Sequence, residues 1–133
     1  MRDSTDFETE IYTMLPSAIQ VLIQKAPEHF FSRLQEIRIR QGRPLMIEVG
    51  DQDYMYDNDG WTIKPEQPYI ISKDEITRTF QLICQGSVYA LEEELKNGYL
   101  TLPGGHRVGL VGKAVMEGGK VKTLRNISGF NIR

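Results

Sequence analysis

The sequence contains little cysteine and no long apolar run, and each absence removes a class of protein. Its 133 residues include one cysteine, Cys84, so no disulfide can form within the chain. No stretch approaches the roughly 18 consecutive apolar residues of a membrane-spanning helix. The first residues also lack the basic and then apolar order of a signal peptide. We therefore expect a cytoplasmic protein that does not insert directly into a membrane.

Histidine is almost as scarce as cysteine. The positions of these residues argue against a zinc site, and no motif indicates nucleophilic catalysis. The two histidines, His29 and His106, are far apart and follow no zinc-binding spacing. Cys84 lies in an apolar helical stripe without a neighbouring histidine, which favours a structural thiol. The sequence shows no nucleophile elbow and no serine, histidine and acid order. It thus predicts neither catalytic residues nor a metal site.

The charged residues divide unevenly along the chain. Residues 1–99 contain 10 Lys and Arg against 17 Asp and Glu, a balance of −7, whereas residues 100–133 contain 6 against 1, a balance of +5. The overall composition, 40% hydrophobic and 26% charged, is that of a folded soluble domain. An acidic body with a basic end favours docking onto a partner or a neighbouring copy, or facing a phosphate group.

Local patterns predict an α+β domain with a largely antiparallel sheet and with N-terminal and central helices packed on one face. Ser72 and Glu75 have the spacing of a capping box, flanked by Ile71 and Ile76 as a hydrophobic staple. This box should begin a helix that Gly86 closes, and a second helix should end at 97–98. Two more helices are expected at 4–14 and 16–26. Alternating apolar and polar residues predict strands at 34–40, 45–49, 53–56, 61–64, 99–102, 107–115, 121–127 and 130–133.

Two glycine-containing patterns near residue 110 are incomplete. The stretch 112–114 resembles the end of a P-loop, but Arg107 stands where the first glycine belongs, and Ala114 lacks the hydroxyl that holds magnesium. Gly109 and Gly112 have the spacing of the GxxG loop of KH domains, although the two residues between them are apolar. We prefer a glycine-tolerant strand, with a KH-like module that binds single-stranded nucleic acid as the alternative.

Several basic side chains are candidates for contacts. Arg38, Arg40 and Arg43 gather on the polar side of one expected strand and its turn. They either pair with nearby glutamates on a solvated sheet face or form a contact face for an acidic partner or a phosphate. His106 either bonds to backbone within a turn or takes part in such contacts.

Three stretches together resemble a known family. They are residues 34–45 (LQEIRIRQGRPL), residues 89–109 (YALEEELKNGYLTLPGGHRVG), and residues 122–128 (KTLRNIS) followed by 131–133 (NIR). The chain resembles the stage III sporulation protein AA family of endospore-forming bacteria over residues 34–133. That family is similar to the traffic ATPases of type II and type IV secretion and of type IV pili.

The resemblance implies a single N-terminal α+β domain over residues 1–133 with a PAS-like antiparallel sheet, and with 1–33 as a helical N-terminal extension. In the parent protein a RecA-like ATPase domain would follow residue 133. The present chain would then be no enzyme and would hold no cofactor, because ATP and magnesium would be bound by that missing domain. The implied partners are the ATPase domain of its own or a neighbouring subunit in a homo-hexamer, and components of a membrane channel.

The implied role is to dock and orient an ATPase that energises the channel between mother cell and forespore. The protein would work in the mother-cell cytoplasm, at the periphery of the forespore membrane, and nucleic acid is not expected as a partner. Basic residues of the equivalent domain face nucleotide in the related secretion ATPases. By this analogy the candidate contacts to a subunit or to nucleotide are Arg107, Arg125, Arg133 and His106, and the candidates for partner docking are Arg38, Arg40, Arg43 and Lys113.

Overall fold

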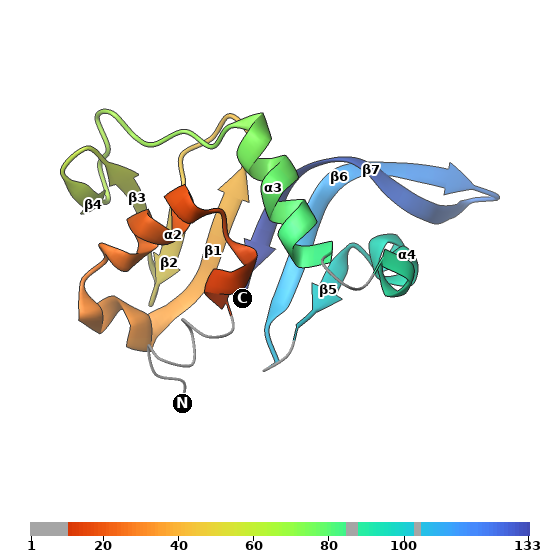
Figure 1. Ribbon diagram of the computed structural model, residues 1–133, viewed down its shortest axis with the longest axis horizontal. Helices are drawn as coiled ribbons and strands as arrows, with labels where there is room; N and C mark the ends of the chain where they lie inside the picture. Colours follow the sequence, from red (N-terminus) through yellow and green to blue (C-terminus); the bar gives the residue numbers. More distant parts are fainter. Residues whose placement is uncertain (1–10, 85–87, 103–104) are drawn as a thin grey trace.

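The computed structural model describes residues 11–84, 88–102 and 105–133 as helices, strands and connecting turns (Figure 1). Three short helical segments come first, four strands and two longer helices follow, and three strands end the chain. In chain order the elements are η1 (Tyr12–Met14), α2 (Ser17–Gln24), η2 (Glu28–Arg33), β1 (Leu34–Arg40), β2 (Met46–Val49), β3 (Gln52–Asp57), β4 (Gly60–Thr62), α3 (Lys73–Cys84), α4 (Val88–Asn97), β5 (Tyr99–Thr101), β6 (Arg107–Glu117) and β7 (Lys120–Ile132).

The strands form one antiparallel sheet in the order β4-β3-β2-β1-β7-β6-β5. Strand β1 is central, because it pairs with its sequence neighbour β2 on one side and with the last strand, β7, on the other. Ile37 thereby lies opposite both Ile47 and Ile132. The α+β class and the antiparallel sheet expected from the sequence are confirmed.

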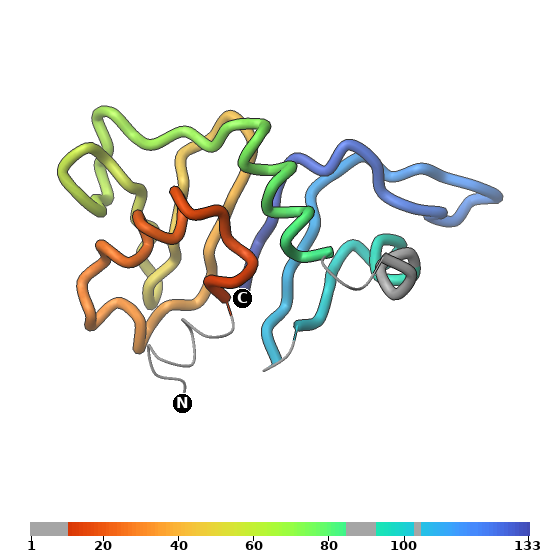
Figure 2. Tube along the Cα trace, viewed as in Figure 1, coloured from red at the N-terminus to blue at the C-terminus, as the bar shows by residue number. Residues whose placement is uncertain are grey.

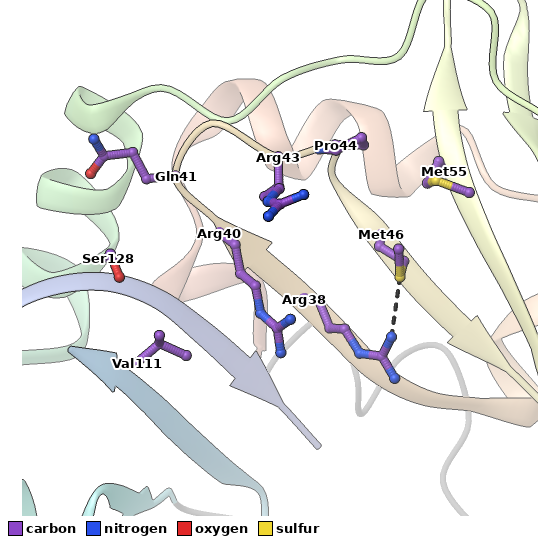
Figure 3. A pocket seen from close by; sticks show the side chains of 9 residues that line it. All are labelled: Arg38, Arg40, Gln41, Arg43, Pro44, Met46, Met55, Val111 and Ser128. Carbon is purple, nitrogen blue, oxygen red and sulfur yellow. Dashed lines mark hydrogen bonds between the residues drawn. The ribbon is translucent and has the colours of Figure 1, made fainter. Parts of the chain in front are cut away.

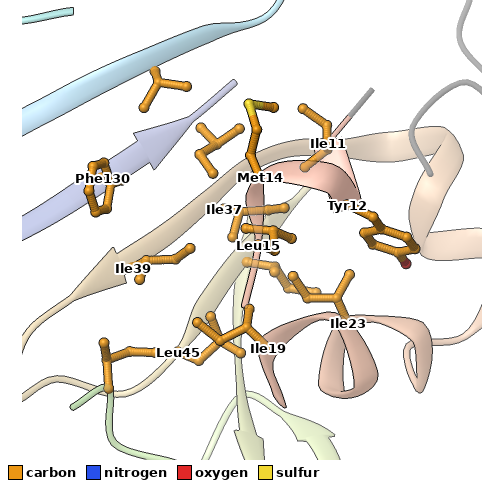
Figure 4. Close-up of a cluster of buried hydrophobic side chains, with 14 of the residues drawn as sticks. Ile11, Tyr12, Met14, Leu15, Ile19, Ile23, Ile37, Ile39, Leu45 and Phe130 are labelled. Atoms are coloured by element: carbon orange, nitrogen blue, oxygen red, sulfur yellow. The ribbon is translucent and has the colours of Figure 1, made fainter. Parts of the chain in front are cut away.

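The hydrophobic core lies on one face of this sheet. Ile37 and Ile39 alternate with polar residues along β1, and both are buried together with Phe130 of β7 (Figure 4). Helix α2 supplies Ile19 and Ile23 to the same cluster. Figure 1 shows α2 and α3 on this side of the sheet, so the expected packing of helices on one face is also confirmed. Burial of these side chains away from water is the main force that holds the helices against the sheet.

The capping box predicted at the start of α3 is present. The Ser72 backbone amide donates to the Glu75 carboxylate at 2.9 Å, and the Glu75 amide donates to the Ser72 hydroxyl at 3.1 Å. Ile71 and Ile76, the expected staple, are both buried. Gly86, which was expected to close this helix, lies outside the described residues.

The chain departs from the predicted elements mainly near its two ends. Of the helix expected at 4–14, the structure describes a single 3₁₀ turn at Tyr12–Met14, after which Leu15 is extended because Pro16 follows it. Residues 4–10 of that helix lie outside the described part. Near the other end, β7 is one continuous strand where two were expected. Among the described residues no helix has the length and hydropathy needed to cross a bilayer.

Strands β6 and β7 extend beyond the rest of the sheet and form a two-stranded projection, here called the arm (residues 112–125; Figure 2). A bulge separates the arm from the sheet, because Val111 pairs with Gly129 whereas the next pair is Lys113 with Arg125. Asn126, within this bulge, has a φ of 52°, which asparagine tolerates better than most residues. Strand β7 also continues through residues 128 and 129, where the sequence predicted a break.

Candidate functional site

The face of the sheet opposite the core is polar at its centre. Glu36, Arg38 and Arg40 occupy alternate positions on β1, so their side chains point away from the buried isoleucines. Helices α2 and α3 leave this part of the sheet uncovered (Figure 3). We call the surface formed here by β3, β2, β1, β7, β6 and β5 the open face.

Arg38 is neutralised by three carboxylates on neighbouring strands. Its guanidinium lies 2.6 Å from Glu36, 3.4 Å from Asp53 and 3.6 Å from Glu48. The hydrogen bond with Glu36, strengthened by the nearby negative charges, raises the pKa of Arg38 above its ordinary value. Of the two interpretations left open by the sequence, pairing with glutamates therefore holds for Arg38.

Glu36 also links β1 to Arg133, which directly follows β7. Its second carboxylate oxygen lies 3.1 Å from the guanidinium of Arg133, although Glu36 itself is 5% exposed. Arg133 is held in register by Arg107, since each backbone amide donates to the other residue's carbonyl, at 2.7 and 2.9 Å. The Arg107 guanidinium stacks over the ring of Tyr99, 4.4 Å from its centroid. Two of the predicted contact arginines are thus brought side by side at one end of the open face.

Arg40 and Arg43 lie on the other side of Arg38, around a hollow of about 540 Å³. The Arg40 guanidinium donates to the Asn131 side chain at 2.9 Å. Within the described part of the chain, neither Arg40 nor Arg43 has a carboxylate at ion-pair distance. Figure 3 shows the three arginines projecting over the strands, with apolar and small side chains around them, namely Pro44, Met46, Met55, Val111 and Ser128.

The other sequence candidates lie elsewhere. His106 is buried, at 7% exposure, and lines a smaller hollow with Ile11 and Phe31. Lys113 and Arg125 face each other across the arm, outside the sheet proper. The eight candidates therefore form three groups: the arginines of the open face, one buried histidine, and a basic pair on the arm.

The sequence did not single out Glu36, Tyr99 or Asn131 as site residues. The period of β1 was enough to place Glu36 on the same face as Arg38. Its contact with Arg133, by contrast, spans 97 positions of sequence and depends on the pairing of β1 with β7. No local pattern signals a pairing over that distance.

This arrangement suits recognition of anions more than covalent chemistry. Guanidinium groups bind carboxylates and phosphates through planar pairs of N–H donors. Burial raises the pKa of the Cys84 thiol, which disfavours the nucleophilic thiolate. Among the described residues no group of three His, Cys, Asp or Glu side chains is placed to hold a metal ion.

The comparisons with known proteins identify the family of the chain. The family described as "Sporulation stage III, protein AA" matches residues 5–133 of the chain. The chain belongs to this family. Stage III sporulation protein AA of Bacillus subtilis (strain 168) is 37% identical over 125 residues, which cover 93% of the chain but 37% of that relative. The family resemblance inferred from the sequence is confirmed, and no solved structure gives a significant match.

The described fold corresponds to only part of the length of this relative. The chain spans little more than a third of the length of its Bacillus subtilis relative within the stage III sporulation protein AA family. Its match to the family nevertheless includes every described helix and strand, from η1 to β7. The family signal therefore belongs to this sheet and its helices.

Proposed function

We propose that this domain docks and orients an ATPase domain in a sporulation protein. Membership of the stage III sporulation protein AA family supports a role connected with sporulation. The proposed partner is a RecA-like ATPase domain of the same or a neighbouring subunit, which would bind ATP and magnesium. The complete hexamer would energise a membrane channel between mother cell and forespore, with this domain on the mother-cell side.

The observation that carries the proposal is the set of arginines on the open face that lack a carboxylate partner. Arg40, Arg43 and Arg107 have no carboxylate within ion-pair distance among the described residues, whereas neighbouring Arg38 has three. The half-buried Met46 and Met55 beside them offer apolar contact area. A surface that combines uncompensated guanidiniums with apolar side chains fits a protein interface or a phosphate held by a partner.

Arg107 and Arg133 are the best placed to reach a bound nucleotide. They lie together at the end of the open face, and Arg133 is well exposed although it contacts Glu36. Arg125 and Lys113, on the arm, and the buried His106 do not share this position. Within the proposal, the arm residues contact protein rather than nucleotide, and His106 supports the fold beneath the arginines.

The KH-like alternative receives no geometric support. Gly109 and Gly112 lie within strand β6, where Gly112 faces the backbone of Arg125. A KH clamp needs these glycines in a loop that joins two helices. The preferred interpretation of this segment as a strand is confirmed.

The test uses a full-length protein that contains this domain, with Arg107→Glu and Arg133→Glu made separately. We expect each reversal to lower ATP hydrolysis about tenfold or more, because a guanidinium that meets phosphate or carboxylate becomes a repelling charge. Arg78→Glu is the matched control, since Arg78 is an exposed arginine on α3. Full hydrolysis in both open-face variants, or an intact protein without ATP hydrolysis, would refute the proposal.

A further inference from the structure

The arm has an excess of positive charge. Between Lys113 and Arg125 it contains four basic residues and one acidic residue, Glu117. Glu117 lies 3.5 Å from Lys122, in an exposed ion pair. Lys113 stands directly opposite Arg125, and like charges in facing positions destabilise a pair of strands. The arm of a single chain is therefore electrostatically unfavourable by itself.

The other strands of the sheet do not pair with the arm. Strand β1 pairs with β7 between Gly129 and Ile132, and β5 pairs with β6 between Arg107 and Gly109, so neither reaches the arm. Near the tip, Met116 pairs with Val121, and these apolar side chains are 57% and 36% exposed. Although helix α4 contacts β7, the tip leaves apolar surface in water, and a two-stranded ribbon is only marginally stable by itself.

The opposite edge of the sheet has the complementary character. We call residues 51–66, which contain β3, β4 and their flanking turns, the acidic edge. It contains five acidic residues against Lys64. Asp59 and Glu66 are exposed and line a shallow hollow of about 300 Å³. Beside them Ile63 is 48% exposed, so the edge also offers an apolar spot among charges.

The basic arm and the acidic edge cannot contact each other within one chain. Strands β3 and β4 lie at one edge of the sheet, and β2, β1 and β7 separate them from β6. Figures 1 and 2 show the arm and the acidic edge at opposite ends of the long axis of the molecule. Their contact therefore needs two chains. Because the net charge of the chain is only −2, whole-molecule repulsion between copies is weak.

We propose that the arm of one chain docks on the acidic edge of a second copy of the same chain. Lys120 and Lys122 meet Asp59 and Glu66, and the apolar tip pair meets Ile63. A contact between two different surfaces is heterologous, so repeated copies add in one direction and close into a ring or continue as a filament. This self-association goes beyond the proposed function, which places neighbouring subunits in a hexamer but assigns no contact between two copies of this domain. It involves neither an ATPase domain nor the arginines of the open face.

The test is a charge swap in the present chain, followed by sedimentation velocity at low and high salt (about 20 and 300 mM). Wild type should associate at low salt and dissociate at high salt. Lys120→Glu with Lys122→Glu should weaken association about tenfold or more, and Asp59→Lys with Glu66→Lys should do the same. The chain with all four substitutions should recover affinity to within about threefold of wild type, because the charges are again complementary.

Circular dichroism and thermal unfolding identify any variant that fails to fold, and Arg78→Glu, an exposed position on α3, serves as the matched control outside the contact. That control should associate like wild type. The readout is association of the chain and not ATP hydrolysis, which separates this proposal from the one that concerns the open face. A wild-type chain that stays monomeric at low salt would overturn the inference. So would association that the four-substitution chain does not recover, or an arm that binds single-stranded DNA while the chain stays monomeric.

Discussion

The centre of the open face and the arm both carry basic side chains, but they differ in how far these positive charges are paired with carboxylates. Arg38 is surrounded by three carboxylates, and the nearly buried Glu36 bridges it to Arg133. On the arm, Lys113 faces Arg125, and only the exposed pair of Lys122 with Glu117 offsets the repulsion among the described residues. The first arrangement connects β1 with β2, with β3 and with Arg133 through ion pairs. The second remains to be neutralised by something outside it.

The two regions also differ in how deeply their apolar side chains are buried. The strands at the centre of the sheet cover a core whose isoleucines are almost wholly inaccessible, whereas the arm leaves Met116 and Val121 in solvent. Stability should therefore reside in the centre, and binding in the arm and in the uncompensated arginines beside it. Each prediction below compares a residue of the main sheet with a matched residue of the arm.

The largest contrast is expected from apolar truncation. Ile39→Ala removes a fully buried side chain from β1 and should lower the free energy of unfolding by about 2–5 kcal/mol, because it leaves a cavity in a packed core. Val121→Ala on the arm should change it by no more than about 0.5 kcal/mol. Urea unfolding followed by the fluorescence of Trp61 measures both. Equal losses for the two variants would show that the arm is part of the cooperative core.

A smaller effect is expected where the arm leaves the sheet. A Cβ added at Gly112 would lie 2.9 Å from the carbonyl oxygen of Arg125 and 3.0 Å from Ile127, so Gly112→Ala must shift one strand. We expect a loss of about 1–3 kcal/mol. Gly109→Ala is the control on the same strand, since its nearest contact would be an ordinary 3.6 Å.

Amide chemical shifts should place the Gly112→Ala disturbance within the arm and its bulge. Shifts spread evenly through the core would contradict the view that the bulge separates the two regions. A Gly109→Ala loss as large as that of Gly112→Ala would show that the contact distances do not govern the cost.

The extent to which this fold follows from local sequence differs between its parts. The capping box of Ser72 and Glu75 involves neighbours three positions apart, and the structure contains both of its hydrogen bonds. The alternation on β1 likewise placed Ile37 and Ile39 inside and Arg38 outside. Such patterns are predictable because their physical cause acts within one turn or one strand.

The parts that were missed depend on distant partners. Continuity of β7 through Asn126 and Ser128 is imposed by pairing with β6 and, further on, with β1, which overrides the local preference of Ser128-Gly129 for a break. The proximity of Arg133 to Glu36 has the same origin. The sequence could therefore nominate the contact arginines, but it could not show which of them the fold neutralises.

The smallest effect should come from comparing two acidic side chains, one at the end of β3 and one on the arm. The Asp57 carboxylate accepts hydrogen bonds from the backbone amides of Gln67, Glu66 and Asn58, and these bonds lower its pKa below the ordinary value of 3.8. A lowered folded-state pKa means that the carboxylate contributes stability above pH 3.8, and that this contribution is lost as pH falls through the folded-state pKa. Asp57→Asn should therefore unfold more easily than wild type near neutral pH, with a difference that shrinks in acid.

Glu117→Gln on the arm, where the side chain makes an exposed ion pair, should leave stability almost unchanged near neutral pH. Thermal unfolding of the three proteins between neutral pH and about pH 2 provides the measurement. A difference between wild type and Asp57→Asn that grows in acid would mean that the ionised carboxylate does not hold the turn between β3 and the segment before α3.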